Sequence, residues 1–204
     1  SRYTLGYNEE HEQASWVAYR LFGHHIQNPS TNRKDNFRSD PKVKTGSAAL
    51  SDYKGSGYDR GHLAPAADFQ WSATAMSESF YMSNMSPQVP GFNRGIWKNM
   101  ESTVRNWAVE NDEIYIVTGP VLGNTLGSIG SNRVSIPSQY YKVILDYKKP
   151  DIKGIGIIMP NEKSDASLSF YAVSIDEVER VTGIDFFPEL PDKIEERLEN
   201  NINV

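Results

Sequence analysis

The segment at residues 93–110 constrains the fold of this chain more than any other. Its apolar side chains recur every three or four positions, which is the spacing of a stripe along one face of an α-helix. The stripe consists of Ile96, Trp97, Met100, Val104 and Trp107, and we expect both tryptophans in the core. Runs typical of β-strands lie before and after this helix, at residues 15–21, 114–117, 140–147, 155–160 and 170–173. The sequence therefore predicts a mixed α and β fold with strands on both sides of a central helix.

Two further helices are expected near the C-terminus. Ser174 with Glu177 three residues later forms the pattern of a capping box, and Gly183 is placed where that helix should end. Residues 191–200 form the pattern of a last amphipathic helix that is dense in charge.

Segments rich in Gly, Pro and polar residues separate these elements. Residues 28–57 and 83–91 have this composition, so we expect loops there. A Gly-Ser-Gly turn signal at residues 55–57 leads into residues 58–69, with the sequence Tyr-Asp-Arg-Gly-His-Leu-Ala-Pro-Ala-Ala-Asp-Phe. We expect this last segment on a short strand or at the end of a hairpin.

Length and composition suit a single domain with a substantial core. The chain has 204 residues, of which 38% are hydrophobic, and we expect residues 1–204 to form one domain. It has no cysteine, which excludes disulfides and thiolate metal sites. No apolar run approaches the ~18 residues of a membrane-spanning helix. The chain begins with Ser1 rather than Met, from which we expect a secreted or periplasmic protein whose leader has been removed.

The net charge of −5 conceals an asymmetry along the chain. Residues 33–105 carry ten Lys and Arg against seven Asp and Glu, a net of +3, and the remainder carries eleven against nineteen, a net of −8. Local potential steers an anionic ligand more effectively than total charge does. The acidic total therefore does not exclude a polyanionic substrate.

Arg60, Gly61 and His62 place a guanidinium group and an imidazole two positions apart. The planar guanidinium fork of Arg suits phosphate oxygens. Histidine, with an ordinary pKa of about 6.5, can accept a proton from water near neutral pH. A phosphate clamp beside a proton acceptor is what hydrolysis of a phosphodiester requires.

A second group of polar residues lies on the expected central helix at steps of four: Asn93, Trp97, Glu101 and Arg105. Successive members would share a face, with a drift of roughly 40° per step. An amide oxygen is a hard ligand of the kind that Mg²⁺ takes, and a nearby carboxylate can orient the water molecules that Mg²⁺ retains.

These residues resemble the motifs of the DNA/RNA non-specific endonuclease family, the ββα-metal nucleases. The resemblance rests on the Asp-Arg-Gly-His stretch at residues 59–62, on Asn-Met-Ser-Pro-Gln at residues 84–88, and on the series from Asn93 to Arg105. Residues 33–41 resemble the segment that supplies another arginine, and recognisable matches run from about Trp16 to Gly119. The resemblance implies an α+β fold with a ββα-metal core and a central mixed or antiparallel sheet flanked by helices.

The resemblance also implies a function and a role for each site residue. His62 would be the general base, Asn93 the direct ligand of one Mg²⁺ ion, and Glu101 the holder of metal-bound water. Mn²⁺ or another divalent ion would be able to replace Mg²⁺. Arg33, Arg60 and Arg105 would bind or neutralise phosphate, and Asn84 would support the imidazole. The substrates would be DNA and RNA, cut to products with 5′-phosphate ends.

Other interpretations of these residues stay open at this point. His62 could be structural, and Asn93 could only cap a helix. Glu101 and Arg105 could form an ordinary surface pair, and Arg38 competes with Arg33 for the upstream position.

Two rival functions also need a test. A catalytically silent module of this fold would bind nucleic acid in a salt-sensitive manner without cutting it. A serine hydrolase would need a G-x-S-x-G elbow, which the sequence lacks. We expect no membrane partner, whereas homodimerisation and a protein inhibitor are left open.

Overall fold

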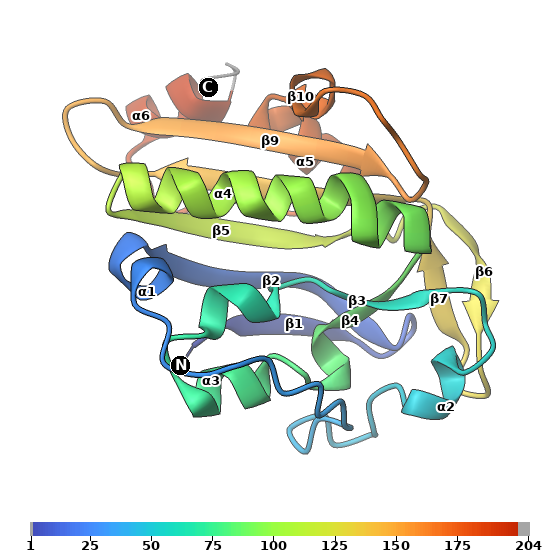
Figure 1. Cartoon of the computed structure of the whole chain (residues 1–204). Coiled ribbons are helices and arrows are strands. Elements are labelled where there is room, and N and C mark those ends of the chain that lie inside the picture. The colour runs from blue at the N-terminus through green and yellow to red at the C-terminus, as the bar shows by residue number, and fades with distance from the viewer. Residues whose placement is uncertain (1, 200–204) are drawn as a thin grey trace.

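The computed structural model describes residues 2–199, and its main feature is a six-stranded antiparallel sheet (Figure 1). All of its neighbouring strands pair antiparallel. In sheet order the strands are β1 (Thr4–Asn8), β2 (Gln13–Phe22), β5 (Glu113–Pro120), β8 (Gln139–Asp146), β9 (Lys153–Pro160) and β10 (Ala172–Val173). The expected α+β fold with a central antiparallel sheet is thereby confirmed. The predicted strand at residues 170–173 is wrong in its first half, because Leu168–Tyr171 forms a short 3₁₀ helix, η4.

Helices cover both faces of this sheet (Figure 1). Tyr140 of β8 packs with the apolar side of α4 (Lys98–Glu110), whereas the adjacent Tyr141 packs with α5 (Ile175–Thr182). Successive side chains of a strand point to opposite faces, so α4 and α5 lie on opposite sides of β8. The last helix, α6 (Asp192–Glu199), contacts β9. No helix in residues 2–199 is long and apolar enough to cross a membrane.

Two small two-stranded sheets flank the large one. One pairs β3 (Asp59–His62) with β4 (Met85–Gln88), and the other pairs β6 (Thr125–Ile129) with β7 (Val134–Pro137). The Asp-Arg-Gly-His stretch therefore lies on a short strand, as predicted. The prediction of a loop over residues 83–91 is wrong, because β4 lies within it. Its Pro87 is tolerated in a strand because β4 pairs with only one neighbour in its sheet.

The remaining helices are short, and the sequence did not predict them. They are α1 (Gly23–Gln27), α2 (Leu50–Tyr53), η1 (Ala66–Phe69), α3 (Ala73–Glu78) and η2 (Met82–Asn84). The loop expected over residues 28–57 is confirmed apart from α2. The expected ends of α5 are confirmed, since the Ser174 hydroxyl accepts from the backbone N–H of Glu177 at 3.2 Å and Gly183 follows the last turn with φ 69°. The last helix is also confirmed over its described part, and Asn200 lies outside the described residues.

The central helix is not continuous, which corrects the prediction of one helix over residues 93–110. A π-helical segment, η3 (Phe92–Trp97), precedes α4, and the two are separated by a break at Gly95 with φ −105° and ψ −112°. Those angles lie outside the helical region, and glycine has the lowest helix propensity of any residue except proline. Asn93 therefore does not lie on the same continuous α-helix as Glu101 and Arg105.

Candidate active site

The β3–β4 ribbon carries the first part of the candidate site. Arg60 pairs with Pro87 and His62 with Met85, so Arg60 and His62 lie two residues apart on one face of β3. Gly61 between them is required by a close approach. A Cβ atom at this position would come closer than 3.0 Å to the side chain of Gln88, which is fully buried.

The His62 imidazole lies in an aromatic enclosure. Its ring centroid is 4.9 Å from that of Phe80 and 5.7 Å from that of Phe37, and the residue is only 8% exposed. Nε2 has no hydrogen-bond partner among the described residues. Burial, with the charges of Arg33 and Arg60, lowers the pKa of His62 to about 3. The ring is therefore neutral at neutral pH and keeps a lone pair available.

Two guanidinium groups flank this enclosure. The Cζ atom of Arg60 lies 4.4 Å from the ring centroid of Phe37, and that of Arg33 lies 5.0 Å from the ring centroid of Phe80. Because each phenylalanine also packs against His62, both charges lie next to the imidazole. Arg33 is exposed and paired with Asp35 at 2.7 Å.

Arg38, the competing upstream arginine, is occupied elsewhere. It donates to the backbone oxygens of Asn36 at 3.1 Å and Ser77 at 2.7 Å, and its guanidinium lies 4.1 Å from the ring centroid of Tyr81. The structure thus brings Arg33, rather than Arg38, to the imidazole.

Asp59, the first residue of β3, fixes the side chain of Asn93. The Asn93 Nδ2 group donates to Asp59 Oδ2 at 2.8 Å, while Arg94 donates to both oxygens of the same carboxylate at 2.8 and 2.6 Å. The amide oxygen of Asn93 is left without a hydrogen bond within the described residues. Sequence reasoning missed this role of Asp59, although the residue stands at the head of the same motif.

Glu101, on α4, lies close to other charged side chains, which include Lys142, Asp68 and Arg105. Burial raises the pKa of Glu101, and the positive charge of Lys142 opposes that shift. Lys142 is 1% exposed, has its Nζ atom 4.9 Å from the Trp97 ring centroid, and makes no hydrogen bond through that atom in the described part of the chain. Burial correspondingly lowers the pKa of Lys142. Sequence reasoning missed Lys142, and the signal for it was a lone charge inside the apolar run of β8.

Arg105 is bound to a carboxylate in this arrangement. It donates to the buried Asp68 at 3.0 Å and to the Ser102 hydroxyl at 3.0 Å, and Tyr19 donates to the second Asp68 oxygen at 2.8 Å. Asp68 is a further residue that sequence reasoning missed. Only the remaining guanidinium donors of Arg105 are available to a ligand.

Asn84 is buried, and within residues 2–199 its side chain bonds to the backbone alone. Its Nδ2 group donates to the carbonyl oxygens of Ala64 and Ser79, both at 2.9 Å, and its Oδ1 accepts from the Ala64 N–H at 3.0 Å. The Leu63 N–H also donates to the Asn84 carbonyl at 3.0 Å. Asn84 therefore holds the chain that follows His62 rather than facing a ligand.

The site residues from β3, η3, α4 and the 28–57 loop converge on one region. Asp59 joins Asn93 to the strand that carries His62. The charge of Arg33 contributes to the lowered pKa of His62 and opposes the rise in the pKa of Glu101. A metal ion would find hard oxygen donors here in the Asn93 amide and the Glu101 carboxylate, which is the donor chemistry of Mg²⁺. Within residues 2–199, no three His, Asp or Glu side chains form a metal-binding group.

Comparison with known proteins places this geometry in context. The model of the family described as DNA/RNA non-specific endonuclease matches residues 1–193. A nuclease of a Nostoc species is 35% identical over 100% of this chain and 77% of its own length, and human mitochondrial endonuclease G is 35% identical over 92% of this chain and 68% of its own length. The crystal structure of the EndoG/EndoGI complex matches with a TM-score of 0.86 and 30% identity, over 95% of this chain and 86% of the other.

Proposed function

Since the chain belongs to the DNA/RNA non-specific endonuclease family, we propose that it hydrolyses phosphodiester bonds of both DNA and RNA with the help of one Mg²⁺ ion. Mn²⁺ or another divalent ion would be able to replace Mg²⁺. The products carry 5′-phosphate ends, and residues 1–204 act as a single nuclease domain. Contacts to phosphate rather than to bases or 2′-hydroxyls account for action on both polymers.

One observation carries this proposal: a neutral imidazole, whose Nε2 atom has no hydrogen-bond partner within residues 2–199, lies close to two guanidinium groups. His62 is the general base, and its depressed pKa keeps it unprotonated before the substrate binds. Arg33 and Arg60 bind the oxygens of the scissile phosphate. The negative charge of that phosphate offsets the two guanidinium charges, and this raises the proton affinity of His62 when it is needed.

The reaction balances without a covalent intermediate. A water molecule gives a proton to His62 as its oxygen bonds to phosphorus, and the bond from phosphorus to the 3′-oxygen breaks. The leaving oxygen takes a proton from solvent and becomes a 3′-hydroxyl, and the phosphate stays on the 5′-carbon of the next nucleotide. His62 then returns its proton to solvent. General-base assistance of this kind contributes on the order of 10²–10⁴-fold to the rate.

Asn93 and Glu101 would hold the metal ion, Asn93 directly and Glu101 through water. When bound, Mg²⁺ stabilises the negative charge that develops on the phosphate oxygens. The hydrogen bond from Asn93 to Asp59 supports this assignment because it leaves the amide oxygen available. Arg105 neutralises the buried Asp68 and offers its remaining donors to phosphate.

The test is cleavage of supercoiled plasmid and of single-stranded RNA with Mg²⁺, compared with an excess of chelator. We expect His62→Ala to lower the rate on both substrates by about 10²-fold or more, whereas His24→Ala, at an exposed position in α1, leaves it unchanged. Removal of 5′-phosphate from the products by a phosphatase checks the polarity of the cut. Equal rates for His62→Ala and the wild-type protein would remove His62 from the mechanism.

The same experiment tests the rival function, a module of this fold without catalytic activity. A catalytically silent module would bind both polymers in a salt-sensitive manner and would cut neither with any divalent ion. The convergence of His62, Asn93 and Glu101 on one region favours the enzyme.

A further inference from the structure

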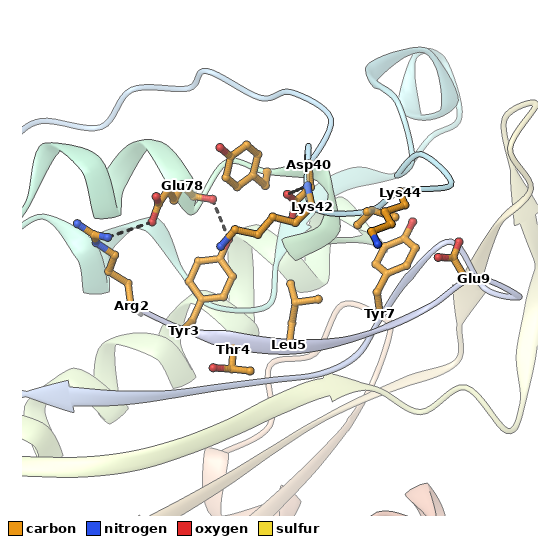
Figure 2. A pocket seen from close by; sticks show the side chains of 12 residues that line it. Arg2, Tyr3, Thr4, Leu5, Tyr7, Glu9, Asp40, Lys42, Lys44 and Glu78 are labelled. Carbon is orange, nitrogen blue, oxygen red and sulfur yellow. Dashed lines mark hydrogen bonds and ion pairs between the residues drawn. The ribbon is translucent and has the colours of Figure 1, made fainter.

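A cavity of about 580 Å³ lies between β1 and the segment at residues 40–44 (Figure 2). Tyr3, Leu5 and Tyr7 project from β1 toward that segment, whereas Thr4 points to the other side, as the alternation of a strand requires. The cavity is of the size of ordinary ligand pockets, about 300–1,000 Å³. None of the site residues assigned above lines it.

The two tyrosines are held in place by their hydroxyl groups. Tyr3 donates to the backbone oxygen of Glu78 at 2.8 Å, and Tyr7 donates to the Glu12 carboxylate at 3.1 Å. The Tyr3 ring also packs against Phe69, with centroids 5.8 Å apart. Aromatic rings that are fixed in this way can stack on a planar ligand with little loss of conformational entropy.

The opposite wall supplies positive charge. Lys42 and Lys44 are exposed, and neither ammonium group forms an ion pair or hydrogen bond with the part of the chain that the structure describes. The three carboxylates of the lining are already bonded. They pair as Glu78 with Arg2 at 3.7 Å, Asp40 with Ser83 at 2.6 Å, and Glu9 with Thr45. A hydrogen bond from a hydroxyl occupies a carboxylate oxygen but does not cancel its charge. The cavity therefore offers a ligand two ammonium groups and aromatic rings, with the carboxylates of Asp40 and Glu9 beside them.

The cavity and the candidate active site share two segments of the chain. Phe37, three residues before Asp40, and Phe80, two residues after Glu78, both pack against the His62 ring. Each of these two segments therefore contributes one phenylalanine to the enclosure of the imidazole and, two or three residues away along the chain, a side chain to the lining of the cavity.

We propose that this cavity binds a stretch of single-stranded nucleic acid beyond the scissile phosphate. Its bases stack on Tyr3 and Tyr7, and its phosphates contact Lys42 and Lys44. This proposal rests on the proposed function, since it assigns a further contact to the same substrate. Aromatic platforms with flanking cations are the usual means of binding single strands without sequence preference.

The first test is binding of a fluorescent 20-nucleotide oligothymidylate to His62→Ala protein in the presence of chelator. Each phosphate contact contributes about 0.7 to the slope of log affinity against log salt for single strands. We expect Lys42→Ser/Lys44→Ser to reduce that slope by about 1.4. The matched control is Lys149→Ser/Lys153→Ser, at the turn before β9 and at its start, far from β1 in the sheet. Equal slopes for the two double variants would overturn the proposal.

The second test separates stacking from hydrogen bonding at Tyr7. Loss of one stacking platform weakens single-strand binding by about five-fold or more, so we expect this for Tyr7→Leu. Tyr7→Phe keeps the ring and loses only the hydrogen bond to Glu12, so it should weaken binding less than Tyr7→Leu does. Equal affinity of the Leu and Phe variants would overturn the stacking role.

Cleavage kinetics distinguish failure of this proposal from failure of the proposed function. With His62 intact, Lys42→Ser/Lys44→Ser should raise KM for a 20-nucleotide strand about ten-fold and leave kcat/KM for a dinucleotide unchanged. A wild-type protein that cuts neither substrate contradicts the proposed function. A wild-type protein that cuts both, with the same KM for the lysine variant on the long strand, contradicts only the role of the cavity.

Discussion

The buried imidazole of His62 makes folding stability depend on pH. Burial and two guanidinium charges lower its pKa from 6.5 to about 3 in the folded protein, whereas in the unfolded chain it titrates near 6.5. Between these values the unfolded state binds more protons than the folded state, so acid favours unfolding. The contribution of His62 to the free energy of unfolding is fully present above pH 6.5 and is lost as the pH falls toward 3.

The size of this effect follows from the two pKa values. At pH 5 the unfolded imidazole is protonated and the folded one is not, which corresponds to 6.5 − 5.0 = 1.5 pKa units. At 1.36 kcal/mol per unit, this amounts to about 2 kcal/mol. We therefore expect urea unfolding of the wild-type protein to lose about 2 kcal/mol more between pH 7 and pH 5 than unfolding of His62→Gln, which has no imidazole there.

The comparison cancels the contributions of the other titrating groups, since both proteins share them. His24→Gln is the matched control for replacing a histidine by glutamine, because it removes an exposed imidazole outside the site. Wild-type and His62→Gln proteins that lose equal stability between pH 7 and pH 5 would refute the reasoning. The imidazole would then be hydrated or paired in the folded state, and its role as a neutral base would lose its physical basis.

Three further substitutions test other parts of the candidate site. Gly61→Ala places a methyl group against the buried side chain of Gln88, and overpacking of this kind costs about 1–3 kcal/mol, so thermal unfolding should occur about 2–12 °C lower. Asp59→Asn removes the carboxylate that orients Asn93, so the Mg²⁺ concentration for half-maximal cleavage should rise several-fold in a metal titration. Asp68→Asn breaks a buried ion pair and should cost about 3–5 kcal/mol in urea unfolding.

Each of these substitutions has a control and an opposing result. Gly123→Ala introduces a methyl group with no neighbour within 4 Å in the described part of the chain, and it should unfold at the wild-type temperature. If Gly61→Ala does the same, the close approach of Gln88 is absent in solution. An unchanged metal dependence in Asp59→Asn would mean that the hydrogen bond to Asp59 does not position the Asn93 side chain. A loss below about 1 kcal/mol in Asp68→Asn would mean that this carboxylate is hydrated.

Local patterns in the sequence predicted those parts of the site that lie within one element. Arg60 and His62 share a face because they are two residues apart on a strand, and this follows from the alternation of side chains alone. The apolar runs of β5, β8 and β9 were recognisable for the same reason. Where two prolines suggested a loop, β4 forms a strand, because the pairing that stabilises it comes from the distant β3.

Contacts between distant elements could not be read from the sequence. Lys142 belongs to β8 and Asp68 to η1, yet both act on the charge of Glu101 in α4. A lysine inside an apolar strand is a recognisable signal, since lysine is rarely buried without a compensating partner. The identity of that partner depends on how the sheet and helix pack, which no local pattern contains.

The position of Asn93 shows how a local argument can fail while the residue it singled out still reaches the site. Steps of four along one helix were expected to align Asn93 with Glu101, but the break at Gly95 ends that alignment. The hydrogen bond to Asp59 positions the Asn93 amide instead. The proposed metal ligand is therefore oriented by the same strand that carries His62. A displacement of that strand would move the base and the metal ligand together, which is why substitutions at Asp59 and Gly61 should affect metal dependence and turnover at once.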